Sequence, residues 1–120
     1  MEKFLFEELI PFIDSNYSTS TFNALIGHSN SATFCHKVLT TNDQPFKGFV
    51  ALSQNLFGNQ LDEFIEFSRR SFVNQIYYFV ASGTRDATPR LESGVKLDSL
   101  FNPTKIPNLR PARYFTMLTI

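Results

Sequence analysis

Phenylalanine dominates the apolar part of this 120-residue chain. The sequence contains 14 Phe and 4 Tyr but no Trp, and aromatic residues make up 15% of it. A phenylalanine side chain has a large apolar area and no polar atom, so most of them must be buried against other side chains. Those that remain exposed would form a surface able to cover a partner or a ligand. We therefore expect the chain to fold around an aromatic core.

The chain is long enough for one folded unit, and we expect residues 1–120 to form a single α+β domain. With 42% hydrophobic and 18% charged residues, it lacks the charge-rich composition of a disordered segment. Cys35 is the sole cysteine, which excludes an intramolecular disulfide and favours a reducing, cytoplasmic location. Acidic residues interrupt the N-terminal apolar run and no stretch is long enough for a membrane helix, so we predict neither a signal peptide nor membrane association.

Two segments carry apolar residues at helical spacing. Residues 2–17 have such a stripe, and Pro11 predicts that this helix ends or kinks near Ile10. A clearer helix is predicted over 60–74, because Asn59 is a good N-cap and acidic residues follow it in the first turn. We therefore expect two helices.

Strands are predicted at several places along the chain. Residues 32–41 alternate in polarity and 46–52 form the next apolar run, so these two segments would pair as a hairpin. Residues 76–81 predict a buried strand and 112–120 a last strand, while 21–26 suit either a short helix or a strand. The predicted fold is α+β, with a small, mainly antiparallel sheet of about four strands and two helices packed on it.

The segment 82–109 contains three prolines, two glycines and no sustained periodicity, so we predict a long loop with at most a short strand at 94–97. Long loops inside a folded domain are often functional. The loop begins with a polar turn at 82–86, whose backbone N–H groups and Arg85 would suit an anion. We favour an ordinary polar turn over such an anion site.

Cys35, His36 and His28 have the side chains for nucleophilic or metal chemistry. A catalytic cysteine needs a base within reach, but on the predicted strand His36 points away from Cys35. The spacing of the three residues also lacks the paired ligands of a zinc site. We interpret Cys35 as a buried, inert thiol and predict no catalytic residue, cofactor or metal. The sequence contains no G-x-S-x-G, H-E-x-x-H, G-x-G-x-x-G or C-x-x-C motif.

The charge pattern argues against nucleic-acid binding, because the formal net charge is zero. All six arginines nevertheless lie in the second half of the chain. Aromatic and arginine side chains are enriched at protein interfaces. Our leading hypothesis is therefore a small intracellular protein-binding or inhibitory protein that acts through an aromatic-rich surface and self-associates as a homodimer. Its speculative binding residues are Arg85, Arg90, Arg110 and Arg113.

The alternative hypothesis is a small enzyme or ligand-binding domain. Its pocket would lie between helix and sheet and be lined by phenylalanines, with Cys35, His36 or Arg85 as the polar groups. The absence of a chemical motif favours the first hypothesis, and the sequence leaves both open.

Overall fold

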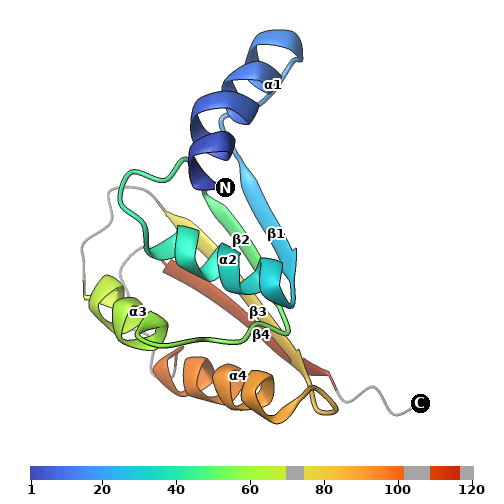
Figure 1. The fold of residues 1–120 in the computed structure, drawn as a ribbon, viewed down its shortest axis with the longest axis vertical. Coiled ribbons are helices and arrows are strands. Elements are labelled where there is room, and N and C mark those ends of the chain that lie inside the picture. Colours follow the sequence, from blue (N-terminus) through green and yellow to red (C-terminus); the bar gives the residue numbers. More distant parts are fainter. Residues whose placement is uncertain (70–74, 102–108, 117–120) are drawn as a thin grey trace.

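The computed structural model describes residues 1–69, 75–101 and 109–116. Its described strands form one four-stranded sheet in the order β1-β2-β3-β4, and every neighbouring pair is parallel (Figure 1). The strands are β1 (Ala24–His28), β2 (Gly48–Leu52), β3 (Ile76–Gly83) and β4 (Leu109–Thr116).

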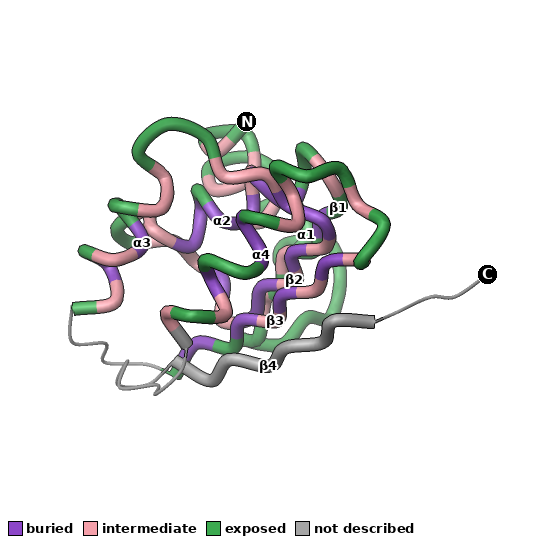
Figure 2. Tube along the Cα trace, turned by 90° about the horizontal axis from the view of Figure 1, so that it is seen from below, coloured by how far each residue is buried: buried purple, intermediate pink, exposed green. Residues whose placement is uncertain are grey.

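Helices connect these strands. They are α1 (Ile10–Asn16), α2 (Asn30–Thr40), α3 (Gln60–Ser68) and α4 (Thr88–Phe101), and a π-helical segment, η1 (Phe4–Leu9), leads into α1. Right-handed crossovers between successive neighbouring strands place their helices on the same face of a sheet. Figure 2 shows α2, α3 and α4 on one side of the strands. The fold is therefore of the α/β type.

The predicted mainly antiparallel sheet with two helices is wrong, because residues 32–41 form most of a helix rather than a strand. Apolar and polar residues do alternate in this segment, but over too few residues to distinguish a strand from a helix. Its buried members fit helical spacing equally well: Ala32, Thr33, Cys35, His36, Val38 and Leu39. Once α2 forms a crossover, β1 and β2 become parallel neighbours, and the predicted hairpin cannot exist.

The predicted long loop over 82–109 is also wrong, since α4 occupies 88–101 and the residues after it lie outside the described part. Pro89 falls in the first turn of α4, where proline is tolerated because an N–H at that position would have no acceptor within the helix. The buried face of this helix offers little apolar signal. Ser93 is buried there beside Leu97, while Val95 is exposed.

Other predictions are confirmed where the structure describes them. Strands occur at β2 and β3, and α3 covers the first part of the predicted helix, whose residues 70–74 lie outside the described residues. The last predicted strand is confirmed up to Thr116, and 117–120 are not described. The predicted break near Ile10 is confirmed in its position: the π-helical segment η1 ends at Leu9, and regular α-helix begins at Ile10 with Pro11 in its first turn.

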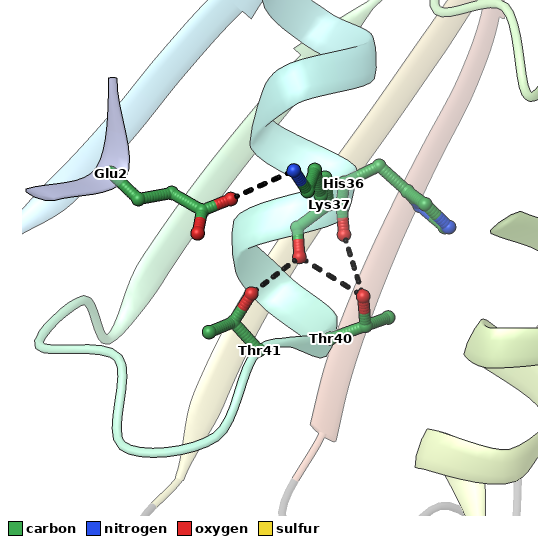
Figure 3. A network of polar contacts seen from close by, with 5 residues as sticks. All are labelled: Glu2, His36, Lys37, Thr40 and Thr41. Atoms are coloured by element: carbon green, nitrogen blue, oxygen red, sulfur yellow. Dashed lines mark hydrogen bonds and ion pairs between the residues drawn. The ribbon is translucent and has the colours of Figure 1, made fainter.

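The N-terminal helix is joined to α2 by an ion pair and to the segment before β2 by ring packing. The Nζ atom of Lys37 lies 3.3 Å from Oε1 of Glu2, and the hydroxyls of Thr40 and Thr41 donate to the Lys37 carbonyl (Figure 3). Ion pairs near the surface contribute at most about 1 kcal/mol. Phe6 also contacts the Phe46 ring at a centroid distance of 6.1 Å, which adds apolar packing to this attachment.

The core lies between the sheet and the three crossover helices that cover one of its faces (Figure 2). Rings from different elements meet in it, including Phe64 of α3 with Tyr78 of β3 at 6.0 Å. The opposite face of the sheet is more open: Ile26 is 68% and Tyr77 48% exposed. Within the described ranges, no helix is both long and apolar enough to span a membrane.

Candidate active site

Polar residues follow three neighbouring strands where each strand ends. His28, Leu52 and Ala81 lie side by side in the sheet. Ser29 and Ser53 come directly after the first two of these positions, and Asp86 lies in the loop after β3. Loops at the carboxyl ends of parallel strands are where ligands bind in open α/β sheets. We therefore take this edge of the sheet as the candidate site.

Ser29 forms the entire connection between β1 and α2. Its backbone has φ 59° and ψ −121°, a conformation that costs a residue other than glycine about 1–3 kcal/mol. The turn is fixed because the Ser29 N–H donates to the Leu52 carbonyl at 2.9 Å, while the Ser29 carbonyl accepts from the N–H groups of Ala32 and Thr33. This sharp strand-to-helix turn presents the Ser29 side chain at the edge of the sheet.

Gly27 allows the start of α2 to lie directly against β1. A Cβ atom at this position would lie 2.7 Å from the Ala32 nitrogen and still closer to the Ser31 carbonyl. Residues 27–31 read Gly-His-Ser-Asn-Ser, which is the G-x-S-x-G pattern of a nucleophile elbow with serine in place of its last glycine. Ser31 at this last position is the one departure from the pattern. Assigning 32–41 to a strand also hid the strand–turn–helix context that identifies it.

Arg90 reaches the Ser29 side chain from α4. Its Nη2 atom donates to the Ser29 Oγ at 2.9 Å, and both residues are partly buried. The first turns of α4 are held by Ser93, whose hydroxyl donates to the Pro89 carbonyl and accepts from the Leu56 N–H. The guanidinium is therefore attached to a fixed part of the helix.

The Asp86 carboxylate is tied to the ends of β2 and β3. Its Oδ2 atom accepts from the Ser53 hydroxyl at 2.7 Å and from the Gly83 N–H at 2.8 Å. Ser53 itself has a positive φ of 53°, and its N–H donates to the Ala81 carbonyl. The turn at 82–86 thus directs its Gly83 N–H at an internal carboxylate rather than at an external anion.

Cys35 and His36 lie in the core, away from this edge. Cys35 is 1% exposed, which confirms the predicted buried thiol, and burial raises its pKa to about 11. His36 is fully buried, with Nδ1 2.9 Å from the Tyr78 hydroxyl and Nε2 3.3 Å from the Gln60 carbonyl. Burial lowers the His36 pKa to about 4. Residues 1–69 and 75–101 contain no cluster of three His, Cys, Asp or Glu side chains able to hold a metal ion.

Four arginines were predicted to bind a partner, and one of them, Arg90, contacts Ser29 at the candidate site. Arg85 is exposed and makes no hydrogen bond or ion pair to another described side chain. Arg110 and Arg113 lie on β4, beside Tyr77 and Val80 of β3, and their side chains fall outside what the structure describes. Their role in binding stays a prediction.

Two hollows on the described surface do not coincide with the predicted pocket. One lies between α2 and α3 and is polar, and the other lies between the N-terminal helix and β1, with Phe22 and Phe46 in its wall. Cys35, His36 and Arg85 line neither of them.

No family model and no curated protein sequence matches the chain. Solved structures share its fold. BES protein from Bacillus cereus matches 97% of the chain at 19% identity and a TM-score of 0.82. The siderophore hydrolase EstA from Aspergillus nidulans matches 94% at 19% identity and a TM-score of 0.71. An IroE-like serine hydrolase from Shewanella oneidensis matches 93% at 23% identity and a TM-score of 0.72.

The chain spans less than half of each of these structures: 47%, 48% and 39% of their lengths, in the same order. At these identities the likeness establishes the fold. The solved structures with this fold include a siderophore hydrolase and a serine hydrolase, which contradicts the hypothesis of a protein-binding or inhibitory protein. The polar groups at the candidate site also differ from Cys35, His36 and Arg85, the residues of the alternative hypothesis, because Ser29 lies there instead.

Proposed function

We propose that this chain carries the nucleophile of a serine hydrolase that cleaves esters. The observation that carries the proposal is the backbone of Ser29, a residue other than glycine held at positive φ between a parallel strand and a helix. Such strain persists where the surrounding structure enforces it, and it is typical of functional sites. In a nucleophile elbow this turn exposes the serine Oγ above the sheet.

The neighbouring backbone supports the chemistry of acyl transfer. The Ser29 Oγ would attack the carbonyl carbon while its proton passes to a base and the carbonyl electrons move onto oxygen. The Asn30 N–H, the first of α2, is one of the donors that a helix leaves without an internal acceptor, and it follows the nucleophile directly. It would stabilise the oxyanion. Expulsion of the alcohol leaves an acyl-serine, which water hydrolyses to the acid and free Ser29.

Asp86 is the candidate for the acid of a triad. In this class of hydrolase the order along the chain is Ser, then Asp or Glu, then His. Asp86 follows Ser29 and lies two strands further along the sheet, after β3. Its Oδ2 accepts from Ser53 and Gly83, which orients the carboxylate and leaves Oδ1 for an imidazole N–H.

Neither of the two histidines of the chain is placed to act as the base for Ser29. Both ring nitrogens of His36 have partners in the core, and His28 is exposed and makes no hydrogen bond to Ser29. The structures that share the fold are more than twice as long as the part this chain matches. Siderophore esters are the first natural substrates to test, since one of those structures is a siderophore hydrolase.

A fluorophosphonate tests the nucleophile directly, because it forms a stable adduct with an activated serine. We expect one adduct per chain by intact mass when the full-length protein is treated at neutral pH, and peptide mapping should place it on Ser29. Ser29→Ala should abolish the adduct. Ser31→Ala is the matched control, since Ser31 is exposed on the first turn of α2, and it should leave labelling unchanged. An unlabelled protein, or an adduct that survives in Ser29→Ala, contradicts the proposal.

A further inference from the structure

We propose that Arg90 makes this site selective for esters that carry a carboxylate near the scissile carbonyl. The inference rests on the proposed function, because it takes Ser29 as the nucleophile. It names the substrate class of the same site.

Arg90 places a positive charge beside the attacking atom. Its Nη2 lies 2.9 Å from the Ser29 Oγ, and a guanidinium has five N–H donors in a planar fork. One donor reaches Ser29. No carboxylate in the described part of the chain lies within ion-pair distance of the Arg90 guanidinium. Several donors therefore remain for a group on the substrate.

The helices that meet at Ser29 add to this positive charge. The two helices that meet at Ser29 are α2 and α4, and neither has an acidic residue in its first turn. The amino end of α2 adds the positive partial charge of a helix dipole. Asp86, in the loop before α4, accepts from Ser53 and Gly83 through Oδ2 and forms no ion pair with Arg90.

The geometry favours recognition of a carboxylate. A guanidinium binds a carboxylate through two parallel N–H···O bonds, which select both charge and orientation. Such selection needs a fixed donor, and the Ser93 hydroxyl fixes this end of α4 through the Pro89 carbonyl and the Leu56 N–H. A substrate carboxylate that reaches Arg90 lies next to the carbonyl that Ser29 attacks.

Two esters that share the same leaving group test the proposal: mono-4-nitrophenyl adipate and 4-nitrophenyl hexanoate. Their acyl chains have the same length, but the adipate ends in a carboxylate and the hexanoate in a methyl group. We expect kcat/KM of the full-length protein to be about tenfold higher for the adipate, a factor typical of one charge-assisted contact. Arg90→Gln should bring the ratio of the two esters to about 1, mainly by raising KM for the adipate. Arg90→Lys should retain part of the preference. Lys96→Gln, which removes an exposed charge further along α4, should retain all of it.

Thermal melting of each variant shows that it is folded. Equal loss on both esters in Arg90→Gln and Arg90→Lys would overturn the inference, because Arg90 would then act on Ser29 alone. A wild-type protein without preference for the adipate would overturn it too. If the wild-type protein cleaves the hexanoate and Ser29→Ala does not, the proposed function is supported whatever the ratio of kcat/KM for the two esters. Cleavage that survives in Ser29→Ala, or no cleavage of either ester, refutes the proposed function and this inference with it.

Discussion

The Nδ1 atom of His36 lies 2.9 Å from the Tyr78 hydroxyl, and neither side chain is exposed to solvent. Burial lowers the pKa of His36 to about 4 and raises that of Tyr78, with Cys35 adding to the rise. Both groups are therefore neutral at physiological pH. A hydrogen bond between neutral groups can be buried without a counterion, so this pair suits a core built from aromatic rings.

We expect the free energy of unfolding to fall as the pH is lowered from about 6.5 to about 4. The unfolded chain binds a proton at His36 near pH 6.5, whereas the folded chain resists protonation until about pH 4. Stability is therefore fully present above pH 6.5, and roughly 3 kcal/mol is lost on the way down. Urea unfolding at several pH values measures the slope. His36→Gln should flatten it and His28→Gln, at an exposed site, should not; the reverse pattern would contradict this assignment.

Gly27→Ala should destabilise the protein by about 2 kcal/mol or more. The added methyl group would meet the backbone of Ser31 and Ala32, which cannot move without shifting the start of α2. Gly83→Ala is the matched control, because its Cβ would make ordinary contacts of 3.6 Å and longer with the Asp86 side chain. The measurement is the melting temperature of the two variants. Similar melting temperatures would show that α2 does not approach β1 so closely.

Ser29→Gly should be more stable than Ser29→Ala by about 1–2 kcal/mol. Both variants lose the hydroxyl that accepts from Arg90, but glycine removes the strain of a positive φ and alanine keeps it. Chemical denaturation compares the two free energies of unfolding. If the alanine variant is as stable as the glycine variant, the backbone at this turn is not strained.

Ser53 and Asp86 should show an energetic coupling of about 1–3 kcal/mol. The Ser53 hydroxyl donates to the Asp86 carboxylate at 2.7 Å, and hydrogen bonds to charged groups are stronger than neutral ones. A double-mutant cycle with Ser53→Ala and Asp86→Ala isolates this interaction. Additive effects of the two substitutions would mean that Ser53 does not orient the carboxylate. The same variants report on activity, which should fall more for Asp86→Ala.

The sequence predicted the elements whose pattern has a single interpretation. Residues 76–81 are a short apolar run, and 60–68 have a helical stripe with acidic residues in the first turn, so both are recognised locally. Residues 32–39 fit both periodicities. The choice between helix and strand depends on the turn at Ser29 and the packing at Gly27, which local patterns do not contain.

The sequence did not predict this candidate site, because its contacts join distant positions. Arg90 was named as a binding residue from the distribution of charge, but its partner Ser29 lies 61 residues away. Ser29 itself was lost in a polar stretch that suggested turns and caps. The pattern Gly-x-Ser before a helix was the available signal, and a search that allowed a small residue at its last position would have found it.

The crossover helices shelter one side of the sheet, and Ile26, aligned with Val50 and Phe79, lies on the other. Purely parallel sheets normally carry a layer on both sides. The exposed Ile26 side chain adds apolar area to this face of the described residues, so the tendency of the molecules to associate depends on the solvent. Sulfate and other excluded solutes, which penalise wetted apolar area, will drive such molecules together, whereas urea at low concentration will keep them apart.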